Sequence, residues 1–298
     1  MRGLAARAAR CAEGGVKGDG GLVVVLGGSR VYGAPPFVAG LGARRVGAHG
    51  VWVAAPAGTA AQRAALDVHL IEAPGPELDA VTVEAAAAVS ARLVRRLADT
   101  AARGRVVWLL GPGLGGSPQA EQVLDAAAEV RDGDRTAGLV VDGSLGGGPG
   151  ARRLLRRLGP DVVLLNRHEA RALMPATERP HGRDASIGAA ALEELAREVG
   201  AAVVAKGDPD RIVTARRAWT VAAGHPGLAR HGTGDVLAGV TAGLLAHALP
   251  AHGAAMLACH LVGSAGAALA SDLGPGWLCG DLLAAVAAEF RDLLVPGR

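Results

Sequence analysis

A single acidic side chain, Asp235, follows a glycine-rich stretch in the segment HGTGDVLAG (231–239). Gly232, Thr233 and Gly234 precede a strong helical pattern, so their backbone N–H groups are expected at a helix N-terminus. Such unpaired donors, together with the helix dipole, favour an anion such as a phosphoryl group. A carboxylate in the first turn can accept a proton from a hydroxyl that attacks phosphorus. The segment therefore predicts a phosphoryl-transfer site, although an N-cap role for Thr233 or Asp235 would use the same residue types.

Two further polar segments come directly after apolar runs. In LLNRHEARAL (164–173), Asn166 and Glu169 stand three residues apart, a spacing that places both side chains on one side of a helical turn. Together they could hold Mg²⁺ waters and phosphate oxygens, but ordinary helix starts carry the same residues. In AKGDPD (205–210), Lys206 is a candidate phosphate partner, and the alternative is a surface lysine before a turn.

The segment GPGLGG (111–116) is similar to a dinucleotide-binding glycine fingerprint. Its second residue is proline, however, and no acid follows a strand at the expected distance. We therefore interpret it as a loop that lets a ligand approach the backbone closely.

Short β-branched runs alternate with stretches of helical period along the chain. This alternation predicts an α/β protein with a mostly parallel central sheet and helices on both faces. In such sheets, ligands bind beyond the carboxyl ends of the strands, where the polar segments above are found. The expected strands are 21–29, 50–56, 105–116, 138–145, 161–166 and 201–208, with a hairpin at 210–222. The expected helices are 35–48, 82–103, 118–131, 150–158 and 189–199, and the chain after residue 222 is expected to be largely helical.

Composition restricts the class of protein. The 298 residues are half apolar, carry a net charge of only +3 and are 2% aromatic, which argues against a nucleic-acid-binding surface. The three cysteines have no metal or redox spacing and indicate reduced thiols in a cytoplasmic protein. Residues 236–271 lack formal charge, but Pro250 interrupts them and they are rich in Gly and Ala, which favours a buried helical pair over a membrane hairpin. We expect residues 1–298 to form one domain.

Several segments in this order resemble motifs of the NAD(P)H-hydrate dehydratases, a family within the ribokinase-like superfamily. One of them is GLARHGTGDVLAGVTAGLLA (227–246), and the segments are specific together, whereas G-T-G-D alone would indicate only the superfamily. The resemblance covers nearly the whole chain. The other segments are VKGDGG (16–21), GGSRVYGAPPFVAGLGARRVGA (27–48), GPGLG (111–115), VVDGSL (140–145), VVAKGD (203–208) and GWLCGDLL (276–283).

The resemblance implies a ribokinase-like three-layer sandwich that uses ADP or ATP, with Mg²⁺, to return hydrated NAD(P)H (NAD(P)HX) to NAD(P)H. In that case Asp235 deprotonates the C6 hydroxyl of the hydrate, and the amides of Gly232, Thr233 and Gly234 hold the transferring phosphoryl group. It also implies nucleotide contacts by Lys206, Gly207, Asp208, Pro209, Asp210 and Gly234, and hydrate contacts by Ala34, Pro35, Gly113, Asn166 and Asp235. A homo-oligomer, dimer or tetramer, and a separate NAD(P)HX epimerase acting in the same pathway are further implications.

The chain departs from the family pattern at several positions. Asn166 replaces a histidine that contacts the substrate, and with Glu169 it matches the N-x-x-E of the superfamily's sugar and vitamin kinases. His231 stands where glycine is usual and Val262 where histidine is expected. We also expect the chain to lack the epimerase domain that is fused to most relatives. A kinase of a small hydroxylated metabolite, similar to hydroxyethylthiazole kinase, and a non-catalytic nucleotide-binding protein are therefore the alternatives.

Overall fold

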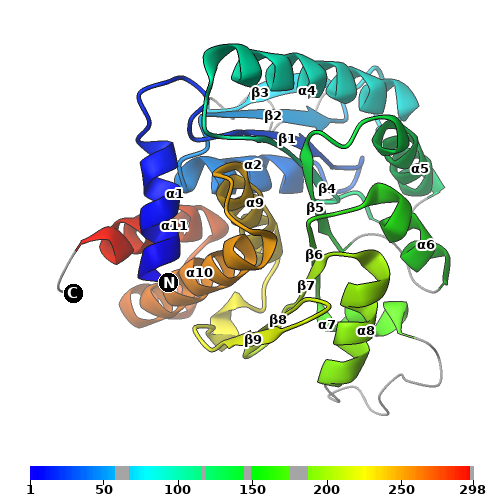
Figure 1. Cartoon of the computed structure of the whole chain (residues 1–298). Helices are drawn as coiled ribbons and strands as arrows, with labels where there is room; N and C mark the ends of the chain where they lie inside the picture. Colours follow the sequence, from blue (N-terminus) through cyan, green and yellow to red (C-terminus); the bar gives the residue numbers. More distant parts are fainter. Residues whose placement is uncertain (58–66, 116–117, 144–148, 175–186, 296–298) are drawn as a thin grey trace.

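A computed structural model describes residues 1–57, 67–115, 118–143, 149–174 and 187–295. Within these residues, nine strands form one sheet in the order β3-β2-β1-β4-β5-β6-β7-β8-β9 (Figure 1). The first seven strands in this order are parallel, and β8 and β9 pair antiparallel to complete the sheet beyond β7. The strands are β1 (Leu22–Leu26), β2 (Gly50–Ala55), β3 (His69–Glu72), β4 (Val106–Leu110), β5 (Gly138–Asp142), β6 (Val162–Leu165), β7 (Ala202–Ala205), β8 (Asp210–Val213) and β9 (Ala218–Val221).

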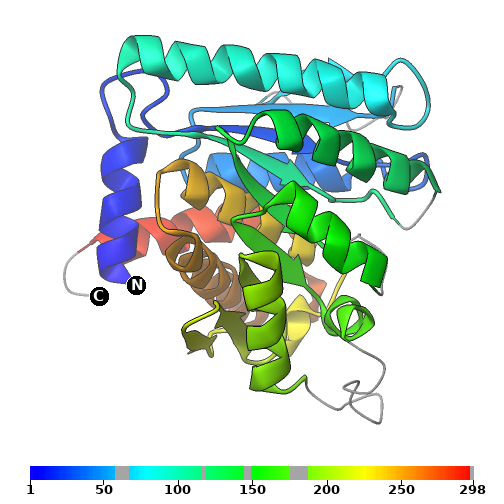
Figure 2. The ribbon, with the colours of Figure 1, turned by 45° about the vertical axis from the view of Figure 1, so that its right-hand side comes forward.

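Helices cover both faces of the sheet (Figures 1 and 2). Strand side chains alternate between the two layers, so Val23 and Val25 join one apolar core and Leu22, Val24 and Leu26 join the other. The first core contains α1 (Arg2–Ala12), α2 (Pro35–Arg45), α9 (Thr233–Ala246), α10 (Ala251–Leu273) and α11 (Cys279–Leu294). The second contains α4 (Ala80–Thr100), α5 (Pro118–Gly133), α6 (Pro149–Leu158), α7 (Arg167–Leu173) and α8 (Ala189–Val199). The predicted three-layer arrangement is confirmed.

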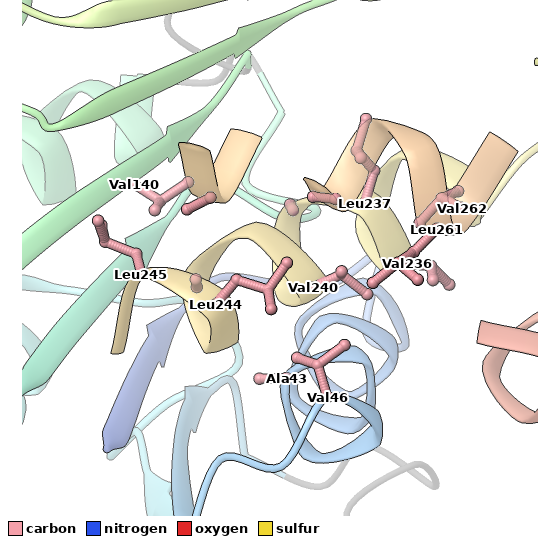
Figure 3. Close-up of a cluster of buried hydrophobic side chains, with 14 of the residues drawn as sticks. Ala43, Val46, Val140, Val236, Leu237, Val240, Leu244, Leu245, Leu261 and Val262 are labelled. Carbon is pink, nitrogen blue, oxygen red and sulfur yellow. The ribbon is translucent and has the colours of Figure 1, made fainter. Parts of the chain in front are cut away.

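Helices α2 and α9 pack backbone against backbone beneath the sheet. A Cβ added at Gly239 of α9 would lie 1.8 Å from the carbonyl oxygen of Ala39, and one added at Gly42 of α2 would lie 2.9 Å from the carbonyl oxygen of Val236. Around this contact, the apolar side chains of α9 fill the space between α2, α10 and β5 (Figure 3). Helix α9 is therefore held in the core by close contact with α2.

The structure differs from the sequence expectation in three elements. Helix α1, strand β3 and helix α7 were not predicted as elements. The predicted strands also run too far, because β4 ends at Leu110 rather than at 116 and β7 at Ala205 rather than at 208. Gly111 has a φ of +124°, which ends β4 and turns the chain away from the sheet.

The apolar segment 236–271 forms the buried helical pair that the sequence favours. Helix α10 is long and apolar enough to cross a membrane by composition alone, but 61% of its apolar window is buried inside the fold. Its small residues, such as Gly263 and Gly266, lie directly against Ala223 and Leu228. Close helix packing accounts for the lack of charge in this segment.

His247, the residue after α9, is fully buried, and its Nε2 lies 2.8 Å from the carbonyl oxygen of Val46. Its Nδ1 has no hydrogen-bond partner. Burial lowers the pKa of His247 to about 4. In the unfolded chain the imidazole takes up a proton near pH 6.5, whereas the folded protein resists protonation until about pH 4, so stability falls as the pH drops through that window.

Replacing His247 by glutamine is expected to remove about 3 kcal/mol of the stability difference between pH 7 and pH 4. The measurement is urea unfolding at both pH values. Exposed His231, replaced in the same way, is the control. An unchanged pH dependence in His247→Gln would contradict the prediction.

Candidate active site

The N-terminus of α9 is shaped by two glycines and opens toward the carboxyl ends of the strands. Gly232 caps the helix with φ +93°, a conformation in which a larger residue would be strained, and an added Cβ would also meet the Sγ of Cys279 at 2.9 Å. The amide of Val236 makes the first bond of the helix, to the carbonyl of Gly232. The amides of residues 232–235 precede that bond, so they are the unpaired donors that an anion would contact, and they include the predicted amides of residues 232–234.

The hydroxyl of Thr233 does not face this anion site. It points back into the preceding loop, where the carbonyl oxygens of Leu228 and Arg230 lie 2.7 and 2.9 Å away as acceptors. Thr233 therefore contributes its backbone to the anion site and uses its side chain to hold the loop.

A buried ion pair lies beside the same helix end. The ammonium of Lys206, just after β7, donates to Asp142, the last residue of β5, at 2.9 Å, and their side chains are only 19% and 12% exposed. A Cβ added at Gly234 would lie 3.6 Å from the Nζ of Lys206. The strand ends of β5 and β7 and the start of α9 therefore meet at one place.

Asp235 lies within this group of charges. Its pKa is raised to about 7, first by burial and then by the carboxylate of Asp142, while Lys206 acts in the opposite direction. Burial opposes the charge on Lys206, yet Asp142 and Glu169 raise its pKa overall. At neutral pH, Lys206 is thus a fixed cation and Asp235 is a carboxyl group that exchanges its proton readily, which suits a general base.

Asn166 and Glu169 form a capping box at the start of α7. The Oδ1 of Asn166 accepts from the amides of His168 and Glu169 at 2.8 and 3.0 Å, and Glu169 accepts from the amide of Asn166 at 2.7 Å. Burial raises the pKa of Glu169. Both residues thus have a structural role, and in the described parts of the chain no three His, Cys, Asp or Glu residues are grouped to hold a metal by themselves. Their predicted part in Mg²⁺ binding stays a prediction.

A cavity of about 850 Å³ opens beside Lys206. Five of the six predicted nucleotide contacts line it, namely Lys206, Gly207, Asp208, Asp210 and Gly234, whereas Pro209 does not. Residues 206–209 form the turn between β7 and β8, in which the amide of Gly207 donates a 2.8 Å hydrogen bond to the Oδ1 of Asp210. The cavity thus joins the anion site to the β7–β8 turn.

The predicted substrate contacts fall into two groups. A Cβ added at Gly113 would lie 3.0 Å from Pro35, the first residue of α2, whose N-cap is Ala34, so these three residues lie together. Asn166 and Asp235 lie near Lys206 instead. Asn166 lines the cavity there, whereas that lining includes neither Asp235 nor the other three residues. Sequence reasoning did not select Asp142 as a site residue, although it ends a buried strand in the segment VVDGSL.

A family model described as NAD(P)H-hydrate dehydratase matches residues 22–287. The chain belongs to the NAD(P)H-hydrate dehydratase family. Among curated members of this family, the chain is 32% identical to a bifunctional NAD(P)H-hydrate repair enzyme of Pyrobaculum aerophilum over 90% of its own length and 50% of the relative's. It is 29% identical to an ADP-dependent (S)-NAD(P)H-hydrate dehydratase of Natrialba magadii, over 92% and 93% of the two chains.

The chain spans about half the length of the bifunctional dehydratase relatives that it matches. Solved structures share the fold: a ribokinase-like superfamily protein of Enterococcus faecalis has a TM-score of 0.68 at 20% identity, covering 98% and 95% of the two chains. An ADP/ATP-dependent NAD(P)H-hydrate dehydratase of Bacillus subtilis, co-crystallised with ATP and Mg²⁺, has a TM-score of 0.68 at 20% identity, covering 94% and 92%. The predicted ribokinase-like fold is therefore confirmed.

Proposed function

We propose that this protein dehydrates NAD(P)HX to NAD(P)H at the expense of ADP or ATP. The observation that carries the proposal is the position of Asp235, a partly buried carboxyl group with a pKa of about 7 in the first turn of α9. A base beside unpaired amides fits a reaction in which a hydroxyl attacks phosphorus. Membership of the NAD(P)H-hydrate dehydratase family supports the choice of substrate.

In the first step, the carboxylate of Asp235 accepts the proton of the C6 hydroxyl, and the hydroxyl oxygen forms a bond to the terminal phosphorus of the nucleotide. The bond from that phosphorus to the bridging oxygen breaks, and the shortened nucleotide leaves. The amides of residues 232–234 and the ammonium of Lys206 stabilise the charge on the phosphoryl oxygens. The ion pair with Asp142 holds Lys206 in place before the nucleotide arrives.

In the second step, the ring nitrogen lone pair expels phosphate from C6, and loss of a proton from the adjacent C5 restores the ring double bond. Phosphate is a far better leaving group than hydroxide, so phosphorylation is what makes the dehydration possible. The net products are NAD(P)H, phosphate and the shortened nucleotide.

Mg²⁺ fits the donor set near the phosphoryl site. Asp142 and Glu169 each place one carboxylate oxygen in a hydrogen bond or ion pair and have a second oxygen for a metal-bound water. Mg²⁺ usually binds through one or two carboxylates, waters and phosphates, and it would neutralise phosphate charge here.

All three cysteines are free thiols, which supports a cytoplasmic location.

The test is recovery of absorbance at 340 nm when purified protein and Mg²⁺ are added to NADHX with ADP, with ATP or with neither. Recovery that requires a nucleotide and releases phosphate supports the proposal. Folded protein that binds nucleotide but recovers no NADH would contradict it, and a stable phosphorylated product from another hydroxyl compound would favour a small-molecule kinase.

A further inference from the structure

Arg230 makes an unusual set of contacts one turn before the anion site. Its Nη1 donates to the carbonyl of Trp277 at 2.6 Å, and its Nε donates to the carbonyl of Gly227 at 2.7 Å. The guanidinium also lies 3.9 Å from the centroid of the Trp277 ring. One side chain thus joins the loop before α9 to the connection between α10 and α11.

Trp277 provides a fixed anchor for this contact. It is 1% exposed and belongs to the apolar core that includes α9 and α10. Two residues further on, Cys279 begins α11, and its Sγ would meet a Cβ added at Gly232 at 2.9 Å. The α10–α11 connection therefore touches the anion site directly as well as through Arg230.

The loop that Arg230 holds has little secondary structure of its own. Between β9 and α9 it contains a single short 3₁₀ turn, η2 (Pro226–Leu228). Besides Arg230, the hydroxyl of Thr233 bonds to the carbonyls of Leu228 and Arg230. Gly232, whose φ is +93°, follows this loop directly, so the loop leads straight into the anion-binding amides.

We propose that Arg230 is a positioning residue that fastens the phosphoryl-binding loop to the α10–α11 connection, so that the amides of residues 232–234 are correctly directed before nucleotide binds. This rests on the proposed phosphoryl-transfer function. Donors to a transferring phosphoryl group must be held to within a fraction of an ångström, and a misplacement of about 1 Å costs roughly 10²-fold in rate.

The contacts use chemistry that is specific to arginine. The planar guanidinium donates to two separate carbonyls while it stacks on an indole face, which the compact ammonium of lysine cannot reproduce. A residue that served only as a positive charge for the nucleotide would accept lysine.

The experiment compares Arg230→Ala and Arg230→Lys with the wild type in NADHX turnover, in ADP affinity and in amide hydrogen exchange of residues 226–234. Exposed Arg216, in the turn of the β8–β9 hairpin, is replaced by alanine as the matched control. Positioning predicts that both Arg230 variants lose kcat by roughly 10- to 100-fold. ADP affinity should change only a few-fold, and residues 226–234 should exchange faster without nucleotide.

Three results would overturn the proposal. Loop exchange equal to the wild type would show that Arg230 does not hold the loop. Full rescue by Arg230→Lys, or a loss of ADP affinity with unchanged kcat, would show that Arg230 acts as a charge on the nucleotide. Because hydrogen exchange needs no substrate, it tests the positioning role even if the wild-type protein fails to act on NADHX, a result that would count against the proposed function alone.

Discussion

Replacing Asp235 by asparagine is expected to lower kcat for NADHX dehydration by roughly 10³-fold, within the range for loss of a general base. Asparagine keeps the shape of the side chain but cannot accept the hydroxyl proton. Nucleotide affinity should be retained, because the amides and Lys206 remain. The measurement is absorbance at 340 nm alongside ADP binding, with exposed Asp272 replaced by asparagine as the control. Wild-type turnover by Asp235→Asn would contradict the role of base.

The same carboxyl group should set the pH dependence. Only deprotonated Asp235 can act as base, so kcat/KM should rise with pH through about 7. The carboxylate of Asp142 contributes to this raised pKa, and Asp142 also neutralises Lys206. Asp142→Asn should therefore move the midpoint of the pH profile to lower pH. A midpoint that stays in place in this variant would show that another group titrates.

Replacing Gly239 by alanine is expected to destabilise the protein by about 3 kcal/mol or to prevent folding. The new Cβ would lie 1.8 Å from the carbonyl oxygen of Ala39, and backbone cannot move aside as a flexible side chain can. Relief requires α2 and α9 to separate, which opens the core around them. Urea unfolding, or recovery of soluble protein if the variant does not fold, measures the effect.

Gly280→Ala is the matched control for this substitution. Gly280 also lies in a helix, α11, but an added Cβ there has no atom within 4 Å. Helix propensity then predicts a small gain, up to about 1 kcal/mol. A wild-type unfolding midpoint for Gly239→Ala would show that the two helices are less closely packed than the structure indicates.

Local patterns of apolar residues were sufficient to predict the layers of the fold, but they did not reveal every helix and strand. The apolar runs of β1, β4 and β5 are buried throughout, so each shows clearly in the sequence. Strand β3, with the sequence HLIE, lies at the sheet edge with three of four residues exposed, so it lacks that pattern. Helix α1 buries only alanines between its arginines, which gives a weak apolar signal.

The site was predictable where one short segment contains both the geometry and the chemistry. Asp235 and the three residues before it are such a case, because glycine, helix start and acid are adjacent in the chain. Asp142 was not predicted because its role depends on Lys206, which is 64 residues further along the chain. Only the order of the strands in the sheet brings the two residues together. Asn166 could be read as ligand or cap, and only the hydrogen bonds show that its oxygen is used in capping.

The glycine contact between α2 and α9 has a consequence for which compounds can react. Ala34 and Pro35 stand at the start of α2, and Asp235 stands at the start of α9, so the two groups are ends of one rigid pair of helices. The span between them is set by the close packing of the two helices. Under the proposed function, a compound anchored at Ala34 and Pro35 would react only if its hydroxyl reached Asp235 across that span. Evolution of a new substrate preference would have to proceed through the surrounding loops, because altering the span itself would cost the fold.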